Sequence, residues 1–366
     1  MKARIIIGAN YGDEGKGTVV ATYAKHAKGK TLNVLTNGGA QRAHSILTEN
    51  GSFTFQHFGA ATPYGADNYF SPFFILNPMQ FVFEYNALAG RNAIQGVKFF
   101  RDKECRWSTP YDMLANQIIE FKRKGGKHGS CGMGIWETTL RYQSTVTIRF
   151  DTFCGLESAE RVSYLKSVRG YFERRIGDIP TDFLPIWTSE NLISHYIEDC
   201  LFLYKNTNTV FDFTKYDEII FENGQGLLLN DTGLDIAGTT PSKTTAEYAL
   251  RMADVFSCDD ISIHYVTRPY LTRHGKGTLE GEQKRSNLSV FVEEDRTNRY
   301  NEFQDDFRYG QLDIEALAER IKEAEAGIKK PHTVYLEVTH CDEMDREVEF
   351  RRFFPNIRIY DRALIV

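Results

Sequence analysis

The sequence has few cysteines for its length, and their spacing excludes two classes of protein. Six cysteines are spread over 366 residues, and no two of them form a Cys-x-x-Cys pair. Zinc ribbons and secreted disulfide scaffolds both need closely spaced cysteines, so neither is expected. The cysteine pattern instead predicts a protein of the reducing cytoplasm.

The sequence also lacks a long apolar run and an excess of basic residues. No stretch of about 18 apolar residues occurs, and the apolar run near the amino terminus is too short for a signal peptide. The formal net charge is -5 at pH 7 and the pI is near 6.0. Nucleic acids and membranes are therefore not expected partners, whereas small solutes are.

The apolar pattern predicts one α/β domain that spans residues 1–366. Near the amino terminus, a strand over 3–8, a helix over 16–28 and a strand over 31–41 predict a βαβ unit. Further strands are expected over 216–229, 261–277 and 333–342, helices from Tyr111, Glu157, Ser189 and Asp313, and a long loop over 280–306. No repeat or linker divides the chain. We therefore predict a mostly parallel central sheet flanked by helices, with functional loops at the strand ends.

The stretch "YGDEGKGT", Tyr11–Thr18, has the ingredients of a phosphate-binding loop without its strict pattern. The P-loop pattern requires a glycine where Asn10 stands, and its hydroxyl residue directly follows the lysine. Gly12, Gly15 and Gly17 nevertheless allow backbone amides to approach an anion, and a helix amino terminus follows.

Two acids inside this loop need an explanation, because a phosphate is itself an anion. Lys16 supplies a cation, but Asp13 and Glu14 are carboxylates. Either the acids serve a reaction, or the segment is an ordinary glycine turn whose acids stabilise the first turn of the helix.

A second glycine-rich segment, "NGGAQRAH" (37–44), follows the next predicted strand. Adjacent parallel strands would bring this loop beside the first, so that Asp13, Lys16 and His44 converge. An acid, a cation and a histidine at strand ends suit a reaction in which a proton leaves and a phosphoryl group arrives. A single histidine, however, is more often structural than catalytic.

With both loops in hand, the sequence resembles the adenylosuccinate synthetase family. The family motif W-G-D-E-G-K-G-K corresponds to residues 11–18, and G-G-H-N-A-G-H-T corresponds to residues 38–45. Further segments follow in the family's order: "GSCGMGI" (129–135), "FENGQG" (221–226), "TPSKTTA" (240–246), "TRHGKG" (272–277), "FRYGQLD" (307–313) and "THCD" (339–342). The resemblance implies a P-loop NTPase-like fold and a ligase that joins L-aspartate to a purine nucleotide.

The resemblance also implies the reaction and a catalytic role for four residues. The family converts GTP, IMP and L-aspartate to adenylosuccinate, GDP and phosphate through a 6-phosphoryl purine. Asp13 matches the base that removes the purine N1 proton, and Lys16 and magnesium offset its charge. His44 matches the donor to O6, and Gln225 matches the residue that holds the purine.

Binding roles follow from the same motifs. Substrate nucleotide contacts are implied for Gln41, Ser130, Cys131 and Thr240, together with an arginine, Arg141, offered across a homodimer interface. The phosphate donor is expected to contact Gly12, Gly15, Gly17 and Thr18, and its guanine is expected to contact Asp342. Arg308 matches the arginine that binds the aspartate carboxylate. Mg²⁺ is the implied cofactor, held by Asp13 and the backbone carbonyl of Ala43.

The chain departs from the family pattern in ways that leave its substrates open. The motif's first histidine is Ala40, and the usually basic aspartate loop is "NEFQDDFR" (301–308). In its compact length the chain resembles archaeal and phage members, including phage enzymes that use dGMP instead of IMP. Those phage enzymes often have serine at the loop aspartate, whereas Asp13 is present here. GTP or ATP also stay open as donors, because the two residues before Asp342 differ from the family motif.

Two other functions are consistent with parts of the sequence. A nucleotide-binding module that has lost catalysis would account for the changes at Ala40, Arg42 and Asp305, although the four catalytic positions are intact. A small-molecule kinase would use a phosphate loop too, but it would ignore aspartate and would be expected to carry a true P-loop.

Overall fold

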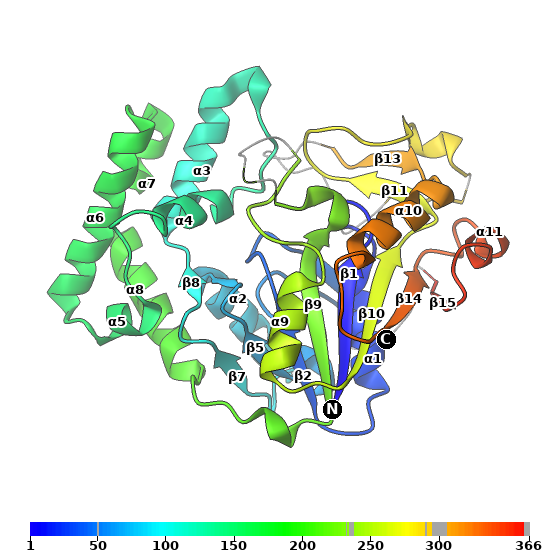
Figure 1. The fold of residues 1–366 in the computed structure, drawn as a ribbon. Coiled ribbons are helices and arrows are strands. Elements are labelled where there is room, and N and C mark those ends of the chain that lie inside the picture. Colours follow the sequence, from blue (N-terminus) through cyan, green and yellow to red (C-terminus); the bar gives the residue numbers. More distant parts are fainter. Residues whose placement is uncertain (50, 232, 234–237, 290, 295–305, 362–366) are drawn as a thin grey trace.

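A computed structural model describes residues 1–49, 51–231, 233, 238–289, 291–294 and 306–361. Its central feature is an eight-stranded sheet in which every neighbouring pair is parallel (Figure 1). In spatial order the strands are β15 (Ile357–Ile359), β14 (Thr333–Val338), β10 (Asp260–Thr267), β1 (Lys2–Gly8), β9 (Glu218–Gly226), β2 (Thr31–Leu35), β5 (Asp67–Phe70) and β7 (Phe99–Arg101). The predicted α/β class with a mostly parallel sheet is confirmed.

Helices cover both faces of this sheet. The side chains of β1 alternate, so that Ile6 faces α1 (Lys16–Lys25) in one hydrophobic core. Ile5 and Ile7 face α9 (Glu247–Val255) and α10 (Ile314–Glu325) in a second core. This alternation with a period of two is what a strand buried on both faces requires.

A group of mostly helical segments lies on the β7 side of the sheet (Figure 1). It comprises α2 (Pro78–Ala89), α3 (Pro110–Arg123), α4 (Ile135–Arg141), α5 (Phe150–Gly155), α6 (Ser158–Ile176), α7 (Leu184–Trp187) and α8 (Glu190–Asn206). The helices predicted from Tyr111, Glu157, Ser189 and Asp313 are confirmed as α3, α6, α8 and α10. Asp313 caps α10 as its sequence position predicts, because its carboxylate accepts from two backbone amides of the first turn.

Small sheets carry the loops around the carboxyl end of the central sheet. They are the antiparallel sheet of β11 (Tyr270–Arg273), β13 (Arg308–Gln311) and β12 (Glu282–Gln283), the hairpin of β3 (His44–Thr48) and β4 (Gly51–Phe55), and the parallel pair of β6 (Ile75–Leu76) and β8 (Arg106–Trp107). A short carboxy-terminal helix, α11 (Glu347–Arg351), precedes β15.

Four predicted strands are shorter than expected, because β9 and β14 also cover only part of the predicted ranges 216–229 and 333–342. The strand predicted over 261–277 leaves the central sheet after Thr267 and resumes as β11 in the small sheet. Pro269 lies in this break and has no amide hydrogen for a ladder. The strand predicted over 31–41 ends at Leu35, before its glycines.

The predicted adjacency of the first two strands is wrong. β9 lies between β1 and β2 and pairs with both of them. Six consecutive residues of β9 are buried, from Ile219 to Gly224, and such a strand gains most from a central position. The strands that precede the two glycine-rich loops are therefore separated by β9, and the end of β9 adds its own residues to the site.

The long loop predicted over 280–306 contains regular structure where it is described. β12 and a 3₁₀ turn over Arg285–Asn287 lie within it, and residues 290 and 295–305 lie outside the described part of the chain. The predicted aspartate-loop residues Asn301 to Asp305 fall in that range. In the described part of the chain, no helix has the length and apolarity needed to cross a membrane.

Candidate active site

The predicted phosphate loop joins β1 to α1. Gly12 and Gly15 have φ angles of 111° and 88°, which favour glycine. Gly15 is the amino-terminal cap of α1, and a Cβ there would lie 3.1 Å from the Thr339 side chain. Thr339 Oγ1 also donates to the Glu14 carbonyl at 2.7 Å, so the "THCD" segment packs directly on the loop.

Glu14 stabilises this loop from inside. Its Oε1 accepts hydrogen bonds from the backbone amides of Asn10, at 3.1 Å, and Gly12, at 2.7 Å. Lys16 Nζ donates to the Gly12 carbonyl at 2.5 Å and lies 3.4 Å from Glu14 Oε2. The alternative in which Glu14 acts as a first-turn acid of α1 is wrong, because the helix begins at Lys16 and its first turn holds no acid.

Asp13 faces a different set of partners. Its Oδ2 lies 3.1 Å from His274 Nδ1, and its side chain keeps 23% exposure. Burial alone would raise the pKa of Asp13, but the charges of His274, Arg268 and Lys16 outweigh it and lower the pKa below its usual value. Asp13 is therefore a carboxylate at neutral pH, and it remains accessible at the loop surface.

The end of β9 lies against the phosphate loop. A Cβ on Gly226 would lie 2.4 Å from the Asn10 carbonyl oxygen, and a Cβ on Gly12 would lie 3.0 Å from Gln225 Cα. Gln225 itself has a φ of 64°, a left-handed conformation that costs a non-glycine residue energy and that often occurs at functional sites. Gln225 thereby reaches the cavity described below.

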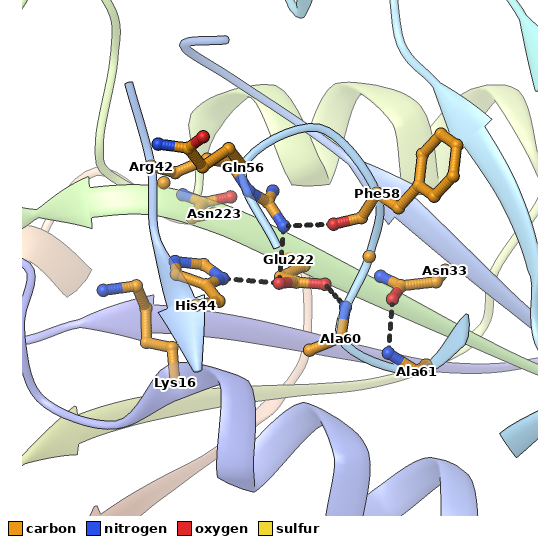
Figure 2. A network of polar contacts seen from close by, with 12 residues as sticks. Lys16, Asn33, Arg42, His44, Gln56, Phe58, Ala60, Ala61, Glu222 and Asn223 are labelled. Atoms are coloured by element: carbon orange, nitrogen blue, oxygen red, sulfur yellow. Dashed lines mark hydrogen bonds and ion pairs between the residues drawn. The ribbon is translucent and has the colours of Figure 1, made fainter. Parts of the chain in front are cut away.

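His44 begins β3 and lies beside the start of α1. A Cβ on Gly17 would lie 3.1 Å from His44 Cβ, which shows how closely the two loops pack. His44 Nδ1 lies 2.5 Å from Oε1 of Glu222, the middle residue of β9 (Figure 2). Burial, and then the charge of Arg42, lowers the pKa of His44 to about 4, so the imidazole is neutral at pH 7.

A cavity beside these loops collects most of the predicted substrate-binding residues. Gln41, Ser130, Cys131, Thr240 and Gln225 all line it. Gln41 Nε2 donates to Thr240 Oγ1 at 2.9 Å, and Ser130 Oγ donates to Asn116 Oδ1 at 2.7 Å. Four segments far apart in the sequence thus meet around one space, as the prediction for a shared phosphate site requires.

The cavity also carries basic side chains that sequence reasoning missed. Arg123, Arg273 and Lys276 contribute to its wall, together with His128 and His274. A concentration of cationic groups in a concave site favours an anionic ligand such as a nucleotide phosphate. Arg273 and Lys276 stand inside the quoted "TRHGKG" motif, so the motif itself was the available signal.

Arg308 is near this cavity, but its charge is already paired in the structure. Its Nε and Nη2 donate to the Glu282 carboxylate at 2.8 and 2.5 Å, and its Nη1 donates to the carbonyls of Gly275 and Gly277. Two nitrogens of the Arg308 guanidinium thus donate to both oxygens of one carboxylate. The predicted contact with the aspartate substrate would have the same geometry. That role stays a prediction.

The remaining predicted contacts lie at the edges of the site. Asp342 is exposed in the turn after β14, three residues beyond Thr339, and Ala43 is exposed just before His44. Thr18 is half-buried in the first turn of α1. Guanine reading by Asp342 and the metal contact of Ala43 stay predictions.

Arg141, predicted to reach across a homodimer interface, is buried and paired within its own chain. Its side chain has 0% exposure, and its Nε and Nη2 donate to the two oxygens of Asp112 in the same chain at 2.9 Å. Nη2 also donates to the Trp107 carbonyl at 2.7 Å. This buried bidentate pair holds α3 against α4, and the contact of Arg141 across a subunit interface stays a prediction.

Glu222 and Arg42 were also not predicted from the sequence as residues of the site. Glu222 has 0% side-chain exposure, although it is a carboxylate, and it lies in the quoted "FENGQG" motif three residues before Gln225. An acid that directly follows the apolar run Ile219–Phe221 in a buried strand was the available signal. Arg42 occupies the position where the family motif has alanine, so no motif pointed to it.

The described residues fit a magnesium ion that is bound together with a ligand. No group of three or more His, Cys, Asp or Glu side chains among the residues described could hold a metal ion by itself. Mg²⁺ commonly binds through one or two carboxylates and completes its shell with substrate phosphates and water. The accessible Asp13 carboxylate at a phosphate loop fits that mode.

Comparison with known families decides what this arrangement belongs to. The family model described as adenylosuccinate synthetase matches residues 5–334, which include both glycine-rich loops and the cavity residues. The chain belongs to the adenylosuccinate synthetase family. Members of this family are carbon–nitrogen ligases.

Curated relatives agree with the family assignment at low identity. The chain is 25% identical over 293 residues to the adenylosuccinate synthetase of Finegoldia magna, covering 77% of this chain and 66% of the relative. It is 26% identical over 304 residues to that of Geobacter metallireducens, covering 78% and 68%. The match thus spans about two thirds of the length of these relatives.

Solved structures share the fold. A fully ligated adenylosuccinate synthetase from Plasmodium falciparum superposes with a TM-score of 0.72 at 16% identity, covering 95% of this chain and 78% of that one. The succinoaminodeoxyadenylate synthetase PurZ of cyanophage S-2L, bound to dGMP and to dATP as an energy donor, superposes with a TM-score of 0.62 at 13% identity. That match covers 98% of this chain and 91% of the phage chain.

Proposed function

We propose that this protein joins L-aspartate to C6 of a purine nucleoside monophosphate, either IMP or dGMP, with hydrolysis of a nucleoside triphosphate. The observation that carries the proposal is the accessible Asp13 carboxylate within a phosphate loop that adjoins a cationic cavity. Family membership supports the same reaction class. The products are adenylosuccinate from IMP or its 2-amino deoxy counterpart from dGMP.

The proposed first step is phosphorylation of the purine oxygen. Asp13 takes the proton from N1, which moves electron density to O6. O6 then attacks the γ-phosphorus, so an O6–phosphorus bond forms while the bond to the β-phosphate oxygen breaks and the nucleoside diphosphate leaves. Asp13 and the Ala43 carbonyl would hold Mg²⁺, which would neutralise charge on the donor phosphates.

The proposed second step is displacement by aspartate. The amine nitrogen attacks C6, the C6–O6 bond breaks, and phosphate departs with that oxygen. Arg308 is proposed to bind the carboxylate of aspartate. In the structure, Arg308 already binds the Glu282 carboxylate in the way that is proposed for the substrate carboxylate. Gln225 and His44 are proposed to orient the purine and the transferred group.

The purine substrate and the donor are proposed as alternatives. The phage PurZ structure holds dGMP and dATP, and its chain is matched over 91% of its length, which supports the dGMP branch. Asp13 and the higher TM-score to the Plasmodium enzyme support the IMP branch. A homodimer in the cytoplasm remains the expected setting.

One assay tests the proposal. Purified protein with Mg²⁺ and L-aspartate is incubated with IMP or dGMP and with GTP, ATP or dATP, and products are identified by mass. We expect aspartate-dependent phosphate release with one purine and the mass of its aspartate adduct. Nucleotide binding without any such release in all combinations would favour the inactive binding module, and phosphoryl transfer that ignores aspartate would favour a kinase.

A further inference from the structure

A buried charged cluster behind His44 has no role in the reaction described so far. Glu222 is surrounded by three donors: His44 Nδ1 at 2.5 Å, Arg42 Nη2 at 2.6 Å and the Ala60 amide at 3.0 Å (Figure 2). The side chains of Glu222, Arg42 and His44 are 0%, 1% and 5% exposed. Such burial of an acid and an arginine is costly unless both are paired.

The charge state of the cluster follows from its composition. Burial alone would raise the pKa of Glu222, but Arg42 and His44 lower it to about 2. Glu222 is therefore a carboxylate and can only accept hydrogen bonds. Because His44 is neutral, its single proton must lie on Nδ1, where it is donated to Glu222, and Nε2 carries a lone pair.

The geometry leaves Nε2 available for other contacts. This nitrogen lies on the side of the ring away from Glu222 and toward Lys16, and no hydrogen bond is drawn to it (Figure 2). Lys16 is the cation of the phosphate loop, and His44 packs against Gly17 of the same loop. Glu222 thus holds the ring so that one edge faces the protein interior and the other faces the loop.

Arg42 has no satisfactory explanation as a stabilising residue alone. Its Nη2 donates to Glu222 and to the Phe58 carbonyl, at 2.6 and 3.2 Å. Its Nε and Nη1 are buried and have no hydrogen-bond partner among the described residues. Burying two unpaired nitrogens of a guanidinium costs free energy of folding. The evident contribution of Arg42 is therefore the positive charge that it places beside Glu222.

We propose that Glu222 and Arg42 are positioning residues of the ligase: Glu222 fixes the orientation and tautomer of His44, and Arg42 fixes Glu222. This inference rests on the proposed function. Nε2 is then the nitrogen of His44 that faces the phosphate loop, and the Glu222 carboxylate offsets the positive charge of the ring whenever both ring nitrogens carry protons. The arrangement is equivalent to the carboxylate–histidine pairs that orient imidazoles in other enzymes.

The first test is spectroscopic and needs no substrate. Nitrogen-15 NMR of histidine-labelled native protein at neutral pH should show His44 protonated on Nδ1 and bare on Nε2, with its signals assigned by their loss in His44→Asn. In Glu222→Gln the Nδ1-protonated fraction should fall, because a glutamine can donate as well as accept. A native His44 protonated on Nε2 would overturn the inference.

The second test is kinetic. Glu222→Gln and Arg42→Met should each lower kcat by at least about 10-fold, with KM values for nucleotide and aspartate within about threefold of native. Arg42→Lys keeps the charge and should recover part of the loss. In a His44→Asn background, Glu222→Gln should cause no further loss, since its effect passes through His44.

A matched control separates positioning from general damage. Arg101 is also buried, with 3% side-chain exposure, and pairs with Asp151 at the end of the edge strand β7, which is three strands away from β9 in the sheet. Arg101→Gln should lower the melting temperature while kcat stays native. If Glu222→Gln keeps kcat within threefold of native, or lowers it equally in the His44→Asn background, the inference is wrong.

The two proposals fail in different ways. Absence of aspartate-dependent phosphate release by the native protein counts against the proposed function. Even without such release, the tautomer of His44 in the native protein shows whether Glu222 positions His44. If Glu222→Gln does not fold, the native spectrum and the comparison of Arg42→Lys with Arg42→Met decide the question.

Discussion

Two neighbouring carboxylates in one phosphate loop have different tasks, and their partners separate them. Glu14 turns inward and accepts from backbone amides that an anionic ligand would otherwise use. Asp13 turns outward to His274 and remains partly exposed. A phosphate loop can therefore hold two acids when one of them completes the loop and the other is available to a substrate.

We expect Asp13→Asn to lower kcat by about 10²-fold or more, because the amide cannot take the N1 proton. The fold should survive, since the two side chains have nearly the same shape. The assay is aspartate-dependent phosphate release, with the melting temperature measured alongside. Asp254→Asn serves as the control, because Asp254 pairs with Lys330 on the surface. Turnover within a few fold of native would remove Asp13 from the role of base.

At the scale of elements, the site depends on how closely the end of β9 approaches the phosphate loop. Gly226 is extended, with φ −143° and ψ 169°, so an alanine meets no backbone strain there. Its Cβ would nevertheless lie 2.4 Å from the Asn10 carbonyl oxygen and 2.7 Å from the Gly12 amide nitrogen. Gly224, two residues earlier, has nothing nearer than 3.7 Å.

These two glycines form a matched pair for testing the approach. Gly226→Ala should push the phosphate loop away from β9 and lower kcat/KM by about 10-fold or more, in line with the cost of misplacing catalytic groups. Gly224→Ala should stay near native in both kcat/KM and melting temperature. Steady-state kinetics on the two variants decide the point, and equal behaviour of both would show that close packing at Gly226 is not required.

The elements differ in how far their sequences predicted them. α3, α8 and α10 carry a polar cap followed by helical periodicity, and they were predicted close to their observed starts. α2 begins with Asn77 as its cap and Pro78 in its first turn, a signal that was present but overlooked. β6 and β8 have two residues each, and strands that short have no periodicity to detect.

The arrangement of the whole molecule was less predictable than its elements. The order of strands depends on contacts between residues far apart in sequence, so the insertion of β9 between β1 and β2 left no local signal. Glu222 beside His44 is a consequence of that insertion. The motifs predicted most members of the site, whereas Arg42 and the true environment of Arg141 depended on tertiary packing.

The last prediction concerns the stability of the whole molecule. His57 is fully buried among the rings of Phe58, Phe70, Phe74 and Phe81, and its Nε2 accepts from the Asn77 amide at 3.0 Å. An acceptor nitrogen carries no proton, so His57 is neutral in the folded protein. Burial, and then the charge of Arg42, lowers the pKa of His57 to about 3.

His44 and His57 make folding sensitive to acid. Both pKa values are lower in the folded protein, about 4 and about 3, than the usual unfolded value of about 6.5. Below pH 6.5 the unfolded chain therefore binds protons that the folded chain does not, and stability falls as the pH falls toward 4. Together the two histidines should cost on the order of 4 kcal/mol at pH 5 relative to neutral pH.

Urea unfolding at pH 7.5 and pH 5.0 measures this loss as a lower midpoint at the acidic pH. His57→Gln keeps an acceptor for the Asn77 amide but cannot take up a proton, so the difference between the two midpoints should shrink by up to roughly half. His195→Gln is the control, because that exposed side chain on α8 meets solvent in both states. A native midpoint that is the same at both pH values, or a His57→Gln variant with the full native difference, would show that the buried histidines do not control acid stability.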